Sequence, residues 1–180
     1  EILNISKKGR EYWLSLNIVP IKNNKGDVTG YIAIESDITE QKRHLEVIAK
    51  NENNYRNLLD TSSEMIHTLN EKSQIKYVNK AWLKNMGFED LKEVEGKPIM
   101  QFFTDNTLKE FSVVMPQLMR GENVEDLVCE FISKDGAVVN ITGRSKPILV
   151  NGEYFGSEAF LFNVTALLKT EKELEKVLRP

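Results

Sequence analysis

Few side chains in this sequence are able to act as a nucleophile, an acid–base group or a metal ligand. It contains two histidines, His44 and His67, and one cysteine, Cys129. Catalysis by such residues needs a partner within hydrogen-bond reach, and a metal site needs several ligands at a characteristic spacing. The sequence contains no paired carboxylates, no nucleophile with a neighbouring base and no glycine-rich phosphate loop. We therefore predict no catalytic residue and no metal site in this chain.

The histidines and the cysteine have plainer interpretations. His67 falls in an alternating strand pattern, where a single histidine is commonly structural, although it could also face a ligand. His44 lies in the segment KRHLEV, which lacks the surroundings of a phosphorylated histidine and indicates a solvated helix residue. Cys129 lies on a predicted strand, and we interpret it as a small buried apolar residue.

The composition describes a globular protein and disfavours several kinds of partner. Hydrophobic residues make up 41% and charged residues 28% of the 180 positions, and no apolar run is long enough for a membrane helix. The net charge is −3 and Lys and Arg form no cluster, which disfavours nucleic acid. Because of the missing apolar run we expect no membrane contact. A single cysteine excludes an intrachain disulfide, so we expect a cytoplasmic location.

Two stretches of the sequence are similar to each other. With one gap, Gly9, Pro20 and residues 37–39 align with Gly136, Pro147 and residues 163–165, at spacings of 127 and then 126 residues. A spacing this long indicates a tandem domain, since solenoid repeats are about 20–50 residues long. We therefore expect one complete domain over residues 61–165 and the C-terminal half of a preceding copy over residues 1–39.

Period-2 alternation predicts strands, and a change to helical spacing predicts helices. Residues 1–6, 10–21 and 28–38 are predicted to form a three-stranded meander. The residues Leu45, Ile48, Glu52, Tyr55 and Leu59 then recur at heptad spacing. This spacing predicts a linker helix over residues 40–60 that either pairs with its twin in a dimer or packs on its own sheet.

The complete domain combines two runs of strands with intervening helices. We predict strands at 64–70 and 74–79, short helices between 80 and 103, and a longer helix at 106–120. Further strands follow at 124–133, 137–149 and 153–163, and a final helix over 166–180 is expected to lead into an output domain. This order indicates an α+β fold with an antiparallel sheet.

These elements carry motifs of a known family. The run YRNLLDTSSEMIHTLNEKSQIKYVNKAWLKNMGFEDLKEVEGKPIMQFF resembles the front half of a PAS sensor domain, and SKDGAVVNITGRSKPILVNGEYFGSEAFLFNVT resembles its back half. Asn79 matches the family's helix-opening asparagine, and Gly87 and Gly96 match its helix-end glycines. Residues 163–165 are a variant of its terminal Asp-Ile-Thr, which residues 37–39 retain, so the resemblance covers nearly the whole chain.

The resemblance implies a PAS fold, a five-stranded antiparallel sheet with helices on one face. Such domains bind small ligands between the two layers or act as dimerising relays without a ligand. Tandem PAS units are similar to the sensory part of two-component sensor histidine kinases, so we expect a kinase domain downstream. The alternatives are a ligand-free dimerisation scaffold of a diguanylate cyclase or chemoreceptor, and a stand-alone ligand-binding protein, which should not begin midway through a domain.

The residues present disfavour two cofactors of the family, flavin and haem. Flavin-binding members place amide side chains at three positions, of which only Asn4 is matched here, because Leu14 and Glu35 occupy the other two. The complete domain also lacks the reactive cysteine in the segment KPIMQFF. A haem sensor needs an axial histidine on the long helix, and residues 105–120 contain none. We predict neither flavin nor haem and leave an unidentified small ligand open.

The family's strand register predicts which side chains of the sheet face the helices. In the complete copy these residues are smaller than in the first copy, so bulky helix side chains or a small ligand must fill the space. The residues expected to line a ligand pocket are His67, Trp82, Val139, Ile141, Gly143, Ser145, Ser157, Ala159 and Leu161.

The same register places Phe160 and Phe162 on the outer face of the sheet. Exposed aromatic residues on a sheet imply a covering element. We expect a homodimer through this face and the linker helices, or cover by the linker helix of the same chain.

Polar residues mark the points where strands become helices. Asp37 and Thr39 lie at the first junction, Asn163 and Thr165 lie at the second, and Asn79 precedes another helix. We expect their side-chain oxygens to accept hydrogen bonds from the free N–H groups of the first helical turn. They serve either as ordinary helix caps or as points through which movement of the sheet reorients a helix.

Overall fold

The computed structural model describes residues 1–178, so the last two positions of the predicted final helix lie outside the described residues. The chain divides into two compact units, Glu1–Tyr55 and the residues from Arg56 onward. Among the described residues, no helix is both long and apolar enough to cross a membrane.

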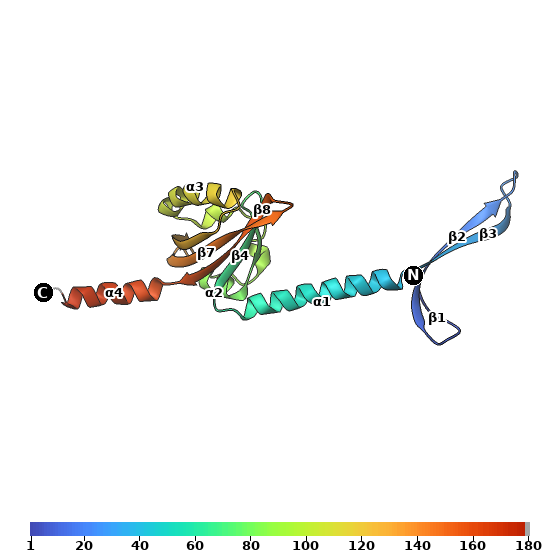
Figure 1. The fold of residues 1–180 in the computed structure, drawn as a ribbon, viewed down its shortest axis with the longest axis horizontal. Helices are drawn as coiled ribbons and strands as arrows, with labels where there is room; N and C mark the ends of the chain where they lie inside the picture. The colour runs from blue at the N-terminus through green and yellow to red at the C-terminus, as the bar shows by residue number, and fades with distance from the viewer. Residues whose placement is uncertain (179–180) are drawn as a thin grey trace. The chain divides into compact units, whose positions relative to one another are not determined.

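The first unit contains an antiparallel meander of β1 (Ile2–Ile5), β2 (Glu11–Lys22) and β3 (Val28–Asp37), in the order β1-β2-β3 (Figure 1). The three predicted strands are confirmed. β1 pairs with the beginning of β2, and β3 pairs with β2 from Leu14 onward, so that Leu14 alone has partners on both sides. Leu14 is buried, whereas apolar residues such as Ile18 and Ile32 are exposed. The meander therefore buries little apolar surface by itself.

Helix α1 (Thr39–Thr61) follows β3 directly. Leu45, Ile48 and Tyr55 of the predicted heptad seam are exposed. Pairing of this seam with a second copy stays a prediction.

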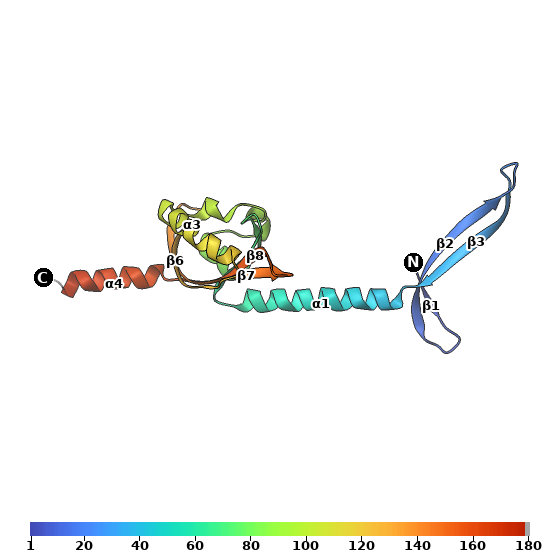
Figure 2. The ribbon, with the colours of Figure 1, turned by 45° about the horizontal axis from the view of Figure 1, so that its top comes forward.

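The second unit is built on a five-stranded antiparallel sheet. Its strands are β4 (Met65–Asn70), β5 (Ile75–Val78), β6 (Val124–Ile132), β7 (Val138–Val150) and β8 (Glu153–Asn163), in the order β5-β4-β8-β7-β6. Helices α2 (Lys80–Met86) and α3 (Asp105–Met119) lie with the short 3-10 helices η1 (Leu91–Glu93) and η2 (Ile99–Phe102) between β5 and β6 in the sequence. α3 lies over one face of the sheet (Figures 1 and 2). The predicted α+β fold is confirmed.

Local signals explain where α2 begins and ends. The Asn79 side chain accepts a hydrogen bond from the backbone N–H of Trp82 and so caps the first turn. Gly87 ends the helix with a φ of 75°, a left-handed conformation that glycine adopts without a Cβ penalty. α4 (Thr165–Leu178) begins just after β8 and has no buried residue.

Apolar side chains fill much of the space between the sheet and the helices. Trp82 packs against Phe88 and Phe102 with ring centroids 6.1 and 5.7 Å away. Trp82 and Met86 are fully buried in this cluster. Bulky helix side chains thus fill the space near α2.

Candidate functional site

Small side chains form the floor of a cavity on the inner face of the second sheet. His67 on β4 pairs with Ala159 on β8, and Ala159 pairs with Ser145 on β7. Residues directly opposite each other in a sheet point to the same face, so these three side chains form one inward row. Ser157 lies two residues before Ala159 on β8, so its side chain points to the same face, and it pairs with Leu69. Because Ala159, Ser145 and Ser157 are short, they leave space between the sheet and α3.

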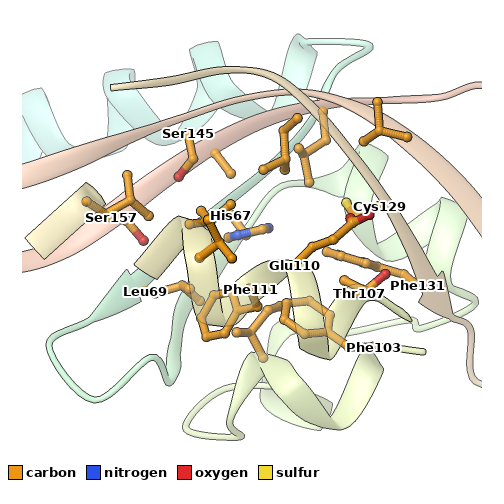
Figure 3. A pocket seen from close by; sticks show the side chains of 18 of the residues that line it. His67, Leu69, Phe103, Thr107, Glu110, Phe111, Cys129, Phe131, Ser145 and Ser157 are labelled. Carbon is orange, nitrogen blue, oxygen red and sulfur yellow. The ribbon is translucent and has the colours of Figure 1, made fainter. Parts of the chain in front are cut away.

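This space is a cavity of about 420 Å³, within the usual size range of small-molecule sites. Figure 3 shows His67, Ser145 and Ser157 on one side and Phe103, Phe111 and Glu110 on another. Of the nine residues predicted to line a pocket, the lining contains His67, Ser145, Ser157, Ala159 and Leu161. That any of these binds a ligand stays a prediction.

The other four predicted residues lie outside the lining of this cavity. Trp82 belongs to the aromatic cluster near α2, and Val139 and Ile141 are buried in the core. Gly143 has a role in the packing of the sheet instead, because a Cβ placed there would lie 2.1 Å from the Phe160 carbonyl oxygen. Its missing side chain lets β7 and β8 approach closely.

Sequence reasoning missed the helical wall of the cavity. Thr107, Glu110, Val114 and Leu118 of α3 line it. Their spacing of three or four residues is the periodicity of one helix face. That spacing is a signal in the sequence that would have identified them.

His67 is the most unusual polar group of the site. Burial lowers the pKa of its imidazole to about 4, so the ring is neutral near pH 7. The ring stacks beside Phe131, with centroids 6.3 Å apart. Its Nδ1 atom is buried and has no hydrogen-bond partner among the residues that the structure describes. A buried polar atom without a partner is energetically costly, and in proteins an ordered water or a ligand commonly supplies such a partner.

The hydroxyl groups of Thr107 and Ser145 have partners within the protein. The Thr107 hydroxyl donates to the Glu130 carbonyl at 3.0 Å and accepts from the Glu130 N–H at 2.8 Å. These bonds attach the start of α3 to β6. The Ser145 hydroxyl donates to the Glu158 carbonyl at 3.3 Å.

Cys129 also borders the cavity and is buried, as the sequence predicted. Burial, with smaller contributions from the nearby Glu110 and Glu130 carboxylates, raises the pKa of its thiol to about 12. Because the thiolate is the reactive form, this cysteine is unsuited to nucleophilic chemistry near pH 7.

Asn79 connects the sheet, α2 and the end of α1. Its Oδ1 accepts from the backbone N–H groups of Ile66 at 2.9 Å and Trp82 at 3.0 Å. Its Nδ2 donates to the carbonyl groups of Leu59 at 2.9 Å and Glu64 at 2.8 Å. Asn79 is fully buried, and both polar atoms of its side chain have hydrogen-bond partners.

The two strand-to-helix junctions have the same hydrogen bonds. The side-chain oxygens of Asp37 and Asn163 accept from the N–H groups of Thr39 and Thr165, each at 2.9 Å. The expectation for the threonine hydroxyls was wrong, because they turn away from the first helical turn. They accept at 2.8 Å from the N–H groups of Trp13 and Asn140 on the neighbouring strand. Each junction thus attaches a helix start to its sheet.

The outer face of the second sheet carries the predicted aromatic residues. Phe160 is half-buried below the Arg144 guanidinium, 5.1 Å from the ring centroid. Phe162 is exposed. Contact of this face with a second copy stays a prediction.

Parts of the chain are similar in sequence to known proteins. The chain is 50% identical over 42 residues to the voltage-gated delayed rectifier potassium channel KCNH8 of Homo sapiens, covering 23% of this chain and 4% of the channel. It is 35% identical over 75 residues to the peroxide stress-activated histidine kinase mak1 of Schizosaccharomyces pombe, covering 38% of this chain and 5% of the kinase. The chain therefore spans only about a twentieth of the length of these relatives.

A solved PAS domain has the same fold. The PAS domain of an HTR-like protein from Haloarcula marismortui superposes with a TM-score of 0.57 at 19% identity, covering 68% of this chain and 98% of that one. The PAS domain family model matches residues 1–40 and 63–166. The protein belongs to the PAS domain family, whose members are signalling domains.

Proposed function

We propose that this chain is the sensory part of a larger signalling protein, in which a small molecule binds in the cavity and reorients the helices that enter and leave the domain. The observation that carries the proposal is the cavity of about 420 Å³ whose lining includes His67, a residue with a buried Nδ1 atom that has no hydrogen-bond partner among residues 1–178. A space of this size with a buried polar atom favours an occupant over an empty core.

Two routes connect the cavity to the helices. His67 follows Ile66, whose N–H donates to Asn79, and Asn79 in turn donates to the Leu59 carbonyl in the last turn of α1. On the other side, β8 runs from Ala159 and Leu161 in the cavity to Asn163, whose side chain holds the first residue of α4. A ligand that moves β4 or β8 therefore acts on a helix end through few bonds.

The proposed output is a histidine kinase domain. The similarity to mak1, which is named as a histidine kinase, supports this choice. We also propose that two copies associate through the linker helices and the outer face around Phe160 and Phe162, where Phe162 is exposed. Sequencing the gene on both sides of this segment tests the output domain.

Mass spectrometry tests the proposed ligand binding. The purified chain is expected to carry a small molecule under native conditions and to release it on denaturation. Ala159→Leu adds bulk inside the cavity and should abolish this bound mass. Thr142→Leu places the same new side chain on the opposite face of the sheet and should keep the bound mass. If no molecule copurifies and no compound in a small-molecule panel raises the unfolding temperature, a ligand-free dimerising relay is the better description.

A further inference from the structure

Among residues 1–178, those that line the cavity carry no positive charge. They include no Lys or Arg, and their two carboxylates belong to Glu110 and Asp126, which are exposed. The ring of His67 adds no charge near pH 7, because burial keeps it neutral. Bringing an anion into such a site costs its hydration free energy without a compensating cation.

Most of the cavity wall is apolar and partly aromatic. Phe103, Phe111 and Phe131 border the cavity, and Phe103 packs on both other rings with centroids 5.2 and 5.1 Å away. Aromatic walls favour aromatic ligands, because offset and edge-to-face contacts add to the burial of apolar area. An engineered apolar cavity of about 150 Å³ holds benzene, so a cavity of about 420 Å³ accommodates a bicyclic molecule.

The clearest polar anchor of the cavity is His67, although the Ser157 hydroxyl, which interacts with the Tyr154 side chain, also lines it. The hydroxyl groups of Thr107 and Ser145 already bond to backbone groups, whereas Nδ1 of His67 is unpaired among the described residues. A neutral imidazole presents either an acceptor or an N–H donor at Nδ1. A hydroxyl group satisfies both cases, since it both donates and accepts.

On the basis of the proposed sensory function, we propose that the cavity selects an uncharged aromatic alcohol, with the ligand hydroxyl on His67 Nδ1 and the ring system against Phe103, Phe111 and Phe131. The exposed carboxylates of Glu110 and Asp126 and the absence of a lining cation make the site select against carboxylates and phosphates of similar size.

Three bicyclic probes of nearly equal size test this specificity by calorimetric titration. 2-Naphthol is expected to bind about 3- to 10-fold more tightly than naphthalene, because one hydrogen bond to a buried group is gained. 2-Naphthoate is expected to bind at least about tenfold more weakly than 2-naphthol, because its carboxylate must leave water. Equal affinity for all three, or a preference for the naphthoate, overturns the proposed ligand class.

Variants of His67 assign the discrimination to its side chain. His67→Leu should remove the advantage of 2-naphthol over naphthalene, and His67→Gln should retain part of it, because glutamine supplies a donor and an acceptor. If His67→Leu does not fold, the comparison of the three probes on the wild-type chain and on His67→Gln still tests whether the side chain of residue 67 binds the ligand hydroxyl. An advantage that persists in His67→Leu overturns the anchor.

The titrations also separate the two levels of the proposal. If none of the probes binds and nothing copurifies, the sensory function itself fails. If naphthalene or the naphthoate binds in the cavity at least as tightly as 2-naphthol and Ala159→Leu blocks this binding, the cavity is a ligand site but the ligand class proposed here is wrong.

Discussion

The side-chain amide of Asn163 donates a hydrogen bond to Oδ1 of Asn85 at 2.8 Å, which joins the end of β8 to α2. The partners of both amides define their orientation. Asn163 Oδ1 accepts from the Thr165 N–H, and Asn85 Nδ2 donates to the Ala81 carbonyl. The equivalent residue of the first copy, Asp37, instead lies 3.6 Å from the Arg10 guanidinium. The departure from Asp at position 163 therefore creates a link that a carboxylate could not make, since a carboxylate has no donor.

Asn163→Asp should weaken this link while keeping the helix cap. The aspartate still accepts from the Thr165 N–H, but it places a carboxylate oxygen against Asn85 Oδ1. We expect a loss of about 0.5–1 kcal/mol in the free energy of unfolding, because the bond is exposed to water. Urea unfolding of Asn163→Asp, Asn85→Ala and the double variant measures the coupling between the two side chains. Strictly additive effects would show that the contact contributes nothing.

Gly143→Ala tests the close approach of β7 and β8. The new methyl group would meet the Phe160 carbonyl oxygen at 2.1 Å, so the strands must separate next to the cavity floor. We expect a loss of about 2–3 kcal/mol in unfolding free energy, as for other overpacked sites. Gly30→Ala is the matched control on a strand, because its Cβ would lie 3.7 Å from Ile21 and its backbone has no left-handed conformation. Similar losses for both variants would rule out a special role for Gly143.

The high thiol pKa of Cys129 predicts slow alkylation of the folded chain. Burial first, and then the Glu110 and Glu130 carboxylates, raise this pKa from 9.0 to about 12. At pH 8 the thiolate fraction of the folded chain is therefore about a thousandfold lower than that of a thiol with the ordinary pKa, since each pKa unit is a factor of ten. Mass spectrometry after iodoacetamide treatment, with the urea-unfolded chain as the reference, measures the ratio of rates. Comparable rates in the two states would mean that the cavity around Cys129 opens readily.

The sequence predicted most elements because their signals are local. Alternation along β7 and β8 correctly placed Ile141, Ser145 and Leu161 on the buried face. The sequence could not reveal that Thr39 and Thr165 turn toward a neighbouring strand, because that depends on pairing between distant residues. The sequence also could not show which part of the interior the Trp82 cluster fills and which part remains a cavity. The packing of α2, η2 and α3 decides this.

The buried imidazole of His67 makes stability depend on pH. Its folded pKa of about 4 lies below its ordinary value of 6.5, so between these values the unfolded chain binds more protons. The contribution of the neutral imidazole to the free energy of unfolding is therefore complete above about pH 6.5 and is lost as the pH falls toward 4. From pH 7 to pH 5 the loss is about 2 kcal/mol. Urea unfolding of the wild-type chain and His67→Gln at both pH values isolates the loss that comes from His67, because the variant keeps every carboxylate. An equal change in both proteins would mean that the imidazole charges while the chain stays folded, and that water or a proton reaches the cavity.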